Sequence, residues 1–187
     1  MKATTKGMET KETAVVRVKH YDSPCGKIIL AATAGGELCL CDWAEQPCAA
    51  RNLRRLARHF HLKTEVSAIT SDTLDKAEKQ LDEYFAGRRK NFDLPLRPTG
   101  TAFQKKVWDA LLEVPYGETR PYIGIARRVG NGKGVRAVAQ AIGANGLCLF
   151  IPCHRVIGAD GTLTGFAGGL AAKKFLLEME KRTAATR

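Results

Sequence analysis

A cysteine and a histidine stand side by side in the segment Ile151–Ile157, whose sequence is IPCHRVI. A thiolate is the reactive form of cysteine, and a neighbouring imidazole or dipole generates it near neutral pH. The apolar run Leu147–Ile151 precedes this pair, and Pro152 favours extended backbone at the residue before it. We therefore expect a buried strand over 147–151 that ends in a turn and presents the thiol of Cys153 at the edge of a pocket.

The chain that carries this pair is strongly basic. Its 187 residues contain 30 Lys and Arg against 19 Asp and Glu, a net charge of +11. Such a charge favours polyanionic partners, nucleic acid first and an anionic membrane second, whereas a basic protein without such a partner is the alternative. The basic residues are also clustered, because the segment Thr119–Asn145 holds five of them and no acid.

The six cysteines form no C-x-x-C pair and have no disulfide-like spacing. The N-terminus is polar, and no segment is long and apolar enough to cross a bilayer. We therefore predict free thiols in a reducing compartment, with a cytoplasmic location, or a nuclear one if the source is eukaryotic. Four cysteines and three histidines lie in the first third, but their spacing does not resemble a zinc motif, and we predict no metal site. Cys148 is expected to pack as a small apolar residue.

The N-terminal half predicts a small α/β domain over residues 13–92, after a flexible tail over 1–12. Alternating or apolar stretches separated by glycine turns predict an antiparallel meander with strands at 14–19, 27–32 and 38–43. Cys39 and Cys41 should then share one face of the third strand. Helical spacing predicts a helix around Leu53–Phe60 and another around Leu74–Tyr84 that stops at Gly87. The proline-rich segment 93–98 is interpreted as a linker.

Residues 99–187 predict a mainly helical domain. Thr101–Gln104 has a capping-box pattern, and it opens a helix whose apolar face is Phe103, Val107, Ala110, Leu111 and Val114. A final helix over about 170–181 is expected to pack through Ala171, Phe175, Leu176 and Met179. Glu180 lies near the end of this helix, where the helix dipole disfavours an acid. The position indicates a specific partner for Glu180, and a solvated side chain is the alternative.

Two short helices at about 122–129 and 135–142, separated by a glycine turn, predict a helix-turn-helix. The second helix is rich in glycine and alanine, whereas helices that read the major groove carry long polar side chains. A smooth helix suits close approach to a DNA backbone or minor groove with little sequence reading. Tight packing in the core is the alternative explanation for these small residues.

Residues 101–181 resemble the O6-alkylguanine-DNA alkyltransferases. The resemblance rests on the active-site signature PCHRV and on five further motifs in family order: Pro152–Val156, Gly100–Gln104, Val114–Gly117, Val135–Val138, Ala144–Asn145 and Gly168–Gly169. The N-terminal half resembles the family loosely, through Asp22–Gly26 and its strand-rich layout. The resemblance implies an α+β fold: a small N-terminal α/β domain with a ribonuclease H-like antiparallel sheet, and a mainly helical C-terminal domain with a winged helix-turn-helix.

The resemblance also implies a reaction and its residues. Cys153 would take the alkyl group from guanine O6 by direct displacement, once per molecule, because a thioether has no easy route back to a thiolate. His154 would activate this thiol through a bridging water, and Glu180 would hold the tautomer of the histidine. Asn145 would brace the active-site turn. Tyr122 would contact the guanine and help to supply a proton to the leaving O6.

Further residues would bind the DNA. Arg136, next to Ala137 on the second helix, would enter the base stack and fill the gap left by a flipped nucleotide. The guanine pocket would be lined by backbone groups near two residues, by one aromatic ring and by a lysine: Val156, Ala167, Phe166 and Lys173. The partner would be double-stranded DNA containing O6-alkylguanine, bound by a monomer with no cofactor, no metal, no membrane and no obligate protein partner.

Two residues depart from the family pattern. Phe166 stands where the family often has tyrosine, and Cys148 stands where it often has proline. Neither the zinc set of some animal members nor the regulatory zinc domain of adaptive-response members is recognisable, so we predict no methylation-switched transcription role. The N-terminal domain is expected to be a scaffold without chemistry.

Three other functions are weighed against the alkyltransferase. A cysteine protease or acyl-transfer enzyme would gain nothing from the basic helix-turn-helix. A non-catalytic binder of alkylated DNA is closer, but Cys153 argues against it. A helix-turn-helix regulator would need specific operator binding, which the smooth helix does not favour.

Overall fold

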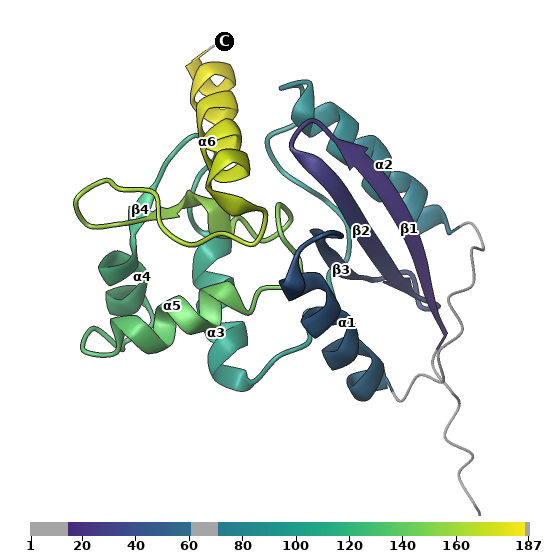
Figure 1. The fold of residues 1–187 in the computed structure, drawn as a ribbon, viewed down its shortest axis with the longest axis horizontal. Coiled ribbons are helices and arrows are strands. Elements are labelled where there is room, and N and C mark those ends of the chain that lie inside the picture. Colours follow the sequence, from purple (N-terminus) through teal and green to yellow (C-terminus); the bar gives the residue numbers. More distant parts are fainter. Residues whose placement is uncertain (1–14, 61–70, 186–187) are drawn as a thin grey trace, which may run out of the picture.

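A computed structural model describes residues 15–60 and 71–185, which form a sheet-containing N-terminal part and a helical C-terminal part (Figure 1). The expected α+β class is confirmed. The predicted tail over 1–12 and the predicted strand residue Ala14 lie outside the described residues. Within the described ranges, no helix is long and apolar enough to cross a membrane.

The N-terminal part is an antiparallel three-stranded sheet with order β1-β2-β3, as the meander prediction required. Its strands are β1 (Val16–Ser23), β2 (Gly26–Thr33) and β3 (Leu38–Trp43). The strand β1 continues past the predicted end at residue 19 because Ser23 pairs directly with Gly26 across a two-residue turn. Gly26 has a φ of 122°, which favours glycine over any residue with a side chain.

A β-bulge places Cys39 and Cys41 on opposite faces of the sheet, so the prediction of a shared face was wrong. The register pairs Ala31 with Leu40 and Ala32 with Leu38, which leaves Cys39 as an extra residue on β3. The extra residue interrupts the simple alternation of side chains. Cys39 therefore packs among the residues on the α1 side, and Cys41 packs in the main core.

One helix covers each face of the sheet. The helix α1 (Pro47–Phe60) packs against the face that contains Ile29, whereas α2 (Asp72–Phe85) packs against the face that contains Leu30. Both helices had been predicted from their apolar spacing. The chain leaves α2 through Gly87, whose φ of 72° suits a residue that follows a helix end.

The segment 93–98 is held against the sheet. The backbone N–H of Leu38 donates to the carbonyl of Pro95 at 2.9 Å, and the N–H of Arg97 donates to the carbonyl of Leu38 at 2.8 Å. These bonds fix the path between the two parts of the chain at the edge of β3.

The C-terminal part consists of helices around a two-stranded parallel pair, β4 with β5. Its elements are α3 (Ala102–Leu112), β4 (Arg120–Pro121), α4 (Tyr122–Arg128), α5 (Val135–Gly143), the single 3₁₀ turn η1 (Cys153–Arg155), β5 (Val156–Ile157) and α6 (Gly169–Ala185). The capping box of α3 is present in full: Gln104 N–H donates to Thr101 Oγ1 at 3.2 Å, and Thr101 N–H donates to Gln104 Oε1 at 3.0 Å. Phe103 is 37% exposed, so its assignment to the buried face of α3 was wrong.

The buried face of α6 is also displaced from the predicted one. Ala171 and Phe175 are exposed, whereas the neighbouring Ala172 is buried with Leu176 and Met179. The prediction used apolar residues alone. It was wrong for Ala171 and Phe175 because the buried face of α6 also contains the two charged residues Lys173 and Glu180. The buried face is therefore rotated around the helix axis from the predicted one.

The larger of two hydrophobic clusters among the described residues runs through both parts of the molecule. It joins β2, β3 and α2 to α3, α6 and the segment 147–151. Backbone hydrogen bonds reinforce the junction: Cys41 N–H donates to Gly146 O and Cys148 N–H donates to Cys41 O, each at 2.8 Å. The N-terminal sheet therefore supports the loop that leads directly to Cys153.

Candidate active site

The five apolar residues before Pro152 form a compact buried loop, so the predicted strand over 147–151 was wrong. All five are buried, but they make only isolated bridges, and Leu149 has a left-handed φ of 71°. Asn145 closes the loop: its Oδ1 accepts from Leu147 N–H and its Nδ2 donates to Ile151 O, both at 2.9 Å. These bonds satisfy backbone groups that a strand would have paired with a neighbour.

Cys153 begins η1 at the end of this loop, 6% exposed and in the wall of a pocket. A hydrogen bond from the thiol of Cys148 lowers the pKa of Cys153 below its ordinary value, and Asn145 and the positive charge of Lys173 act in the same direction. Burial and the nearby carboxylate of Asp42 oppose this effect. Because a hydrogen bond to the thiolate favours the charged form, these contacts favour ionisation of the Cys153 thiol although the side chain is buried.

The carboxylate of Glu180 is fully buried and accepts hydrogen bonds from several directions. Its Oε1 accepts from the Tyr84 hydroxyl at 2.7 Å, His154 Nε2 at 2.9 Å and an Arg155 terminal nitrogen at 2.9 Å. Its Oε2 accepts from Arg155 Nε at 2.9 Å and Gly117 N–H at 3.0 Å. Burial alone would raise the pKa of Glu180, but the bonds from His154 and Arg155 hold it well below its ordinary value. The partner that the sequence required for this acid is therefore present, and the solvated alternative does not hold.

The Glu180 contact fixes the tautomer of His154. An ionised carboxylate only accepts hydrogen bonds, so the imidazole must carry its proton on Nε2. Burial lowers the pKa of His154 and favours the neutral ring, although the bond to Glu180 opposes this effect. Its Nδ1 is buried and has no hydrogen-bond partner among the described residues. The ring therefore holds an available lone pair on Nδ1, next in sequence to the thiol.

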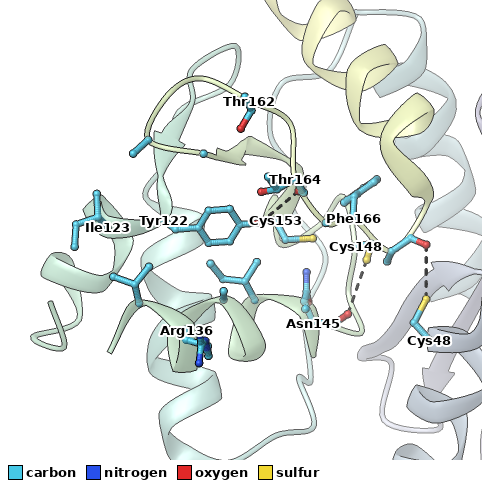
Figure 2. Close-up of a pocket in the computed structure, with 18 of the residues that line it drawn as sticks. Cys48, Tyr122, Ile123, Arg136, Asn145, Cys148, Cys153, Thr162, Thr164 and Phe166 are labelled. Atoms are coloured by element: carbon cyan, nitrogen blue, oxygen red, sulfur yellow. Dashed lines mark hydrogen bonds between the residues drawn. The ribbon is translucent and has the colours of Figure 1, made fainter. Parts of the chain in front are cut away.

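A pocket of about 980 Å³ opens in front of Cys153 (Figure 2). Its wall includes Tyr122, Phe166 and Ala167 from the C-terminal part, together with Arg136 on α5. Figure 2 shows the ring of Tyr122 beside Cys153 and the side chain of Phe166 on the opposite side of the thiol. Apolar and aromatic walls around one nucleophile suit a flat organic group.

Five of the predicted site residues lie outside the wall of this pocket, and two of them, His154 and Glu180, form the buried cluster behind Cys153 described above. Val156 and Lys173 are fully buried behind it, and Ala137 is exposed on α5 beside Arg136. Lys173 Nζ donates to the carbonyl of Thr164 at 2.7 Å and lies 5.9 Å from the centre of the Tyr122 ring. Burial lowers the pKa of Lys173 to about 8. This lysine therefore holds the loop that contains Thr164, whose carbonyl is also 3.5 Å from the Tyr122 hydroxyl.

The helices α4 and α5 lie next to each other and form the predicted helix-turn-helix (Figure 1). Residues of both helices line the pocket. On α5, Val138, Ala141 and Ile142 are buried, while Arg136 and Ala137 face outward. The small residues on the buried face therefore pack in the core, and those on the outer face leave a smooth exposed surface next to Arg136. Among the residues that the structure describes, Arg136 makes no ion pair with an acid, which leaves its charge available to a phosphate or a base.

Sequence reasoning missed four residues that the N-terminal part contributes to the site. Tyr84 contacts Glu180, and Asp42 Oδ1 lies 3.8 Å from Cys148 Sγ. Trp43 packs edge-on against Phe166 with ring centroids 4.9 Å apart, and Cys48 lies 3.8 Å from the carbonyl of Ala167. The only sequence signal was the helical spacing of Tyr84 with Leu81, and it indicated a core position rather than a contact with Glu180.

In the described ranges, no group of three or more His, Cys, Asp or Glu side chains is arranged to hold a metal ion. The reactive groups that the structure brings together are the thiol of Cys153, the imidazole of His154 and the buried carboxylate of Glu180. A helix-turn-helix beside a buried cysteine nucleophile defines a class of protein that binds nucleic acid and offers a thiol to it.

Comparison with known proteins identifies the family. Residues 16–98 match the family model described as "6-O-methylguanine DNA methyltransferase, ribonuclease-like domain", and residues 102–182 match "6-O-methylguanine DNA methyltransferase, DNA binding domain". A methylated-DNA–protein-cysteine methyltransferase of Haemophilus influenzae is 39% identical over 163 residues, which cover 87% of this chain and 84% of that protein. The chain therefore belongs to the O6-methylguanine-DNA methyltransferase family.

Further relatives agree with this assignment. A Methanosarcina acetivorans protein with the same description is 56% identical over 105 residues, covering 56% of this chain and 67% of that protein. The crystal structure of Mycobacterium tuberculosis O6-methylguanine methyltransferase has a TM-score of 0.76 at 40% identity, with 92% of this chain and 97% of that chain covered. The same bacterial protein in complex with DNA has a TM-score of 0.73 at 40% identity, with 90% and 93% covered.

Proposed function

We propose that this protein repairs DNA by moving the alkyl group of O6-alkylguanine onto its own Cys153 in a single, irreversible transfer. The observation that supports it most directly is the position of Cys153, a thiol with a lowered pKa in the wall of a pocket beside the helix-turn-helix. The activity is that of a methylated-DNA–protein-cysteine methyltransferase, the description that the relatives carry.

The reaction is a displacement at the alkyl carbon. The proton of the Cys153 thiol passes to Nδ1 of His154, through a bridging water, and the thiolate sulfur attacks the carbon attached to O6. The carbon–oxygen bond breaks, its electron pair stays on O6, and the guanine takes up a proton that the Tyr122 hydroxyl helps to supply. The charge that develops on His154 is offset by Glu180, 2.9 Å from Nε2. General acid–base assistance of this kind contributes roughly 10²–10⁴ in rate.

The alkylated base must leave the duplex before the thiol can reach it. Arg136, exposed at the start of α5 and part of the pocket wall, enters the stack in place of the extruded nucleotide. The neighbouring Ala137 allows the helix to approach the backbone closely. The base then lies between Tyr122 and the loop that contains Phe166 and Ala167, and Asn145 keeps the Cys153 loop in position.

Val156 and Lys173 support the guanine pocket from behind it. Val156 is buried in β5, and Lys173 holds the Thr164 carbonyl at 2.7 Å. We further propose that the protein acts as a monomer on double-stranded DNA, without a cofactor and without an obligate protein partner. A cytoplasmic location, or a nuclear one in a eukaryote, agrees with a DNA substrate and with six free thiols.

Intact-protein mass spectrometry tests the proposal. The full chain is mixed with duplex DNA containing O6-methylguanine, beside Cys153→Ala and the matched control Cys25→Ala, which removes a thiol outside the pocket wall. We expect one methyl group per molecule in the wild type and in Cys25→Ala, mapped to Cys153, and none in Cys153→Ala. Tight binding of the alkylated duplex without any gain in mass would instead support a non-catalytic binder of alkylated DNA.

A further inference from the structure

Tyr84 extends from the N-terminal part into the catalytic cluster of the C-terminal part. It lies on the last turn of α2, its ring is fully buried, and its hydroxyl donates to Glu180 Oε1 at 2.7 Å. The same hydroxyl oxygen is 3.5 Å from His154 Nε2. No other described side chain of the N-terminal part makes a hydrogen bond to Glu180 or His154.

This hydroxyl shares its acceptor with the histidine. Oε1 accepts from Tyr84, from His154 Nε2 and from an Arg155 terminal nitrogen, so three donors divide the negative charge of one oxygen and Tyr84 competes directly with the histidine. Burial and the charge of Glu180 raise the pKa of Tyr84 well above its ordinary value, and the hydroxyl remains a donor at all working pH values. The stronger the Tyr84 bond, the weaker the pull of Oε1 on an imidazolium at His154.

We propose that Tyr84 is a positioning residue for the transfer reaction: its hydroxyl orients Glu180 and sets the basicity of His154 from the N-terminal domain. The proposal rests on the proposed function. It would replace the prediction that this domain is a scaffold without chemistry. Without the hydroxyl, Oε1 would stabilise the imidazolium more strongly and the carboxylate would lose one of the bonds that fix its plane.

Other charged or titratable groups also act on His154 and must stay constant in a test. They come from η1 and from α6: Arg155, Lys173 and Glu180. Tyr116, in the segment after α3, interacts with Glu180 and Arg155. Arg155 and Lys173 lower the pKa of His154, whereas Glu180 raises it. The Tyr84→Phe substitution removes none of these groups, and phenylalanine keeps the buried ring in place.

The test compares the wild type with Tyr84→Phe in single-turnover methyl transfer across pH. We expect the rate near pH 7 to fall by about tenfold, as for a modest loss of orientation in a catalytic group. Because His154 must be neutral to accept a proton, its higher pKa should also move the midpoint of the pH–rate curve to higher pH. The control is Tyr21→Phe, whose hydroxyl donates to Asp82 at 2.9 Å, away from the cluster, and which should match the wild type.

An unchanged rate and an unchanged midpoint in Tyr84→Phe, with normal DNA binding, would overturn the inference. A fall in rate without a shift in midpoint would reduce Tyr84 to a packing role and would also overturn it. If the variant does not fold, proton NMR of the wild type decides, since the Tyr84 hydroxyl proton should exchange slowly and lie close to the His154 ring. If the wild type transfers no methyl group, the proposed function fails, and alkylation of Cys153 by iodoacetamide across pH still tests the effect of Tyr84.

Discussion

The nucleophile depends on its immediate neighbours for its ionisation. Cys153 is almost fully buried, and burial by itself would hold a thiol in its neutral form. The thiol of Cys148 and the amide of Asn145 offset that cost by hydrogen bonding to the sulfur. Cys148 was interpreted from the sequence as a packing residue. Its side chain is indeed buried, but it also acts on the reactive group, which composition alone did not indicate.

Replacement of Cys148 by alanine should raise the pKa of Cys153. The hydrogen bond favours the thiolate, so its loss shifts the ionisation of Cys153 to higher pH. Below the new pKa less thiolate is present, and alkylation of Cys153 by iodoacetamide should slow at pH 7 but recover at high pH. Peptide mapping by mass spectrometry across pH measures this. Cys48→Ala is the matched control, since that thiol also contacts Asp42; an equal shift in both variants would contradict the assignment.

The helix-turn-helix combines a buried face with an exposed one. Val138, Ala141 and Ile142 anchor α5 in the core, and Arg136 on its first turn is both exposed and part of the pocket wall. A short helix of small residues can approach a DNA backbone closely, so a single long side chain stands out from its surface. The element therefore suits extrusion of a base better than the reading of a sequence.

Arg136→Ala should slow methyl transfer from duplex DNA by about tenfold, because the gap in the base stack is no longer filled and unstacking costs a few kcal/mol. Binding to duplex should weaken less than the transfer rate falls. Transfer from single-stranded DNA, which has no such gap, should be nearly unaffected. Single-turnover rates on the two substrates measure the difference. Lys79→Ala, an exposed cation on α2, is the control, and equal losses on both substrates would argue against insertion into the stack.

At the scale of the whole molecule, the N-terminal sheet forms part of the active-site support. One hydrophobic core continues from β2 and β3 into the Cys153 loop, and Trp43 packs against both Phe166 and Gly168. A Cβ at Gly168 would lie 2.5 Å from the indole, far inside van der Waals contact. The pocket loop is therefore seated on a side chain that is distant in sequence.

Gly168→Ala should destabilise the protein by about 1–3 kcal/mol, the usual cost of overpacking a buried contact. The loop with Phe166 and Ala167 must shift away from Trp43, and methyl transfer should slow with it. Urea unfolding and single-turnover rates measure the two effects. Gly35→Ala is the control because its Cβ would meet only ordinary contacts, the nearest at 3.7 Å, and should change stability by less than about 0.5 kcal/mol. Wild-type stability in Gly168→Ala would mean that the loop is not held in this way.

The sequence by itself determined most of the element types, the two-part organisation and the reactive pair, but not the loop over 147–151. The spacing of apolar residues, the glycines that end helices and strands, and the capping box are all local signals in the sequence. They predicted the meander, both N-terminal helices and the helix-turn-helix. The motif that contains Cys153 and His154 is contiguous, so it too could be recognised without a fold. The resemblance to the family added the long-range assignment of Glu180 to His154, which no local pattern contains.

Tertiary structure decided the contacts between segments that are far apart in the chain. The run 147–151 is apolar enough for a strand, yet the side chain of Asn145 satisfies its backbone and bends it into a loop. The bulge at Cys39 and the buried charges on α6 changed which residues face the core, because pairing register and burial of Lys173 and Glu180 depend on distant partners. Tyr84 had only the spacing of a core residue in the sequence. Its contact with Glu180 exists because α2 packs across the site, and 96 residues separate the two in the chain.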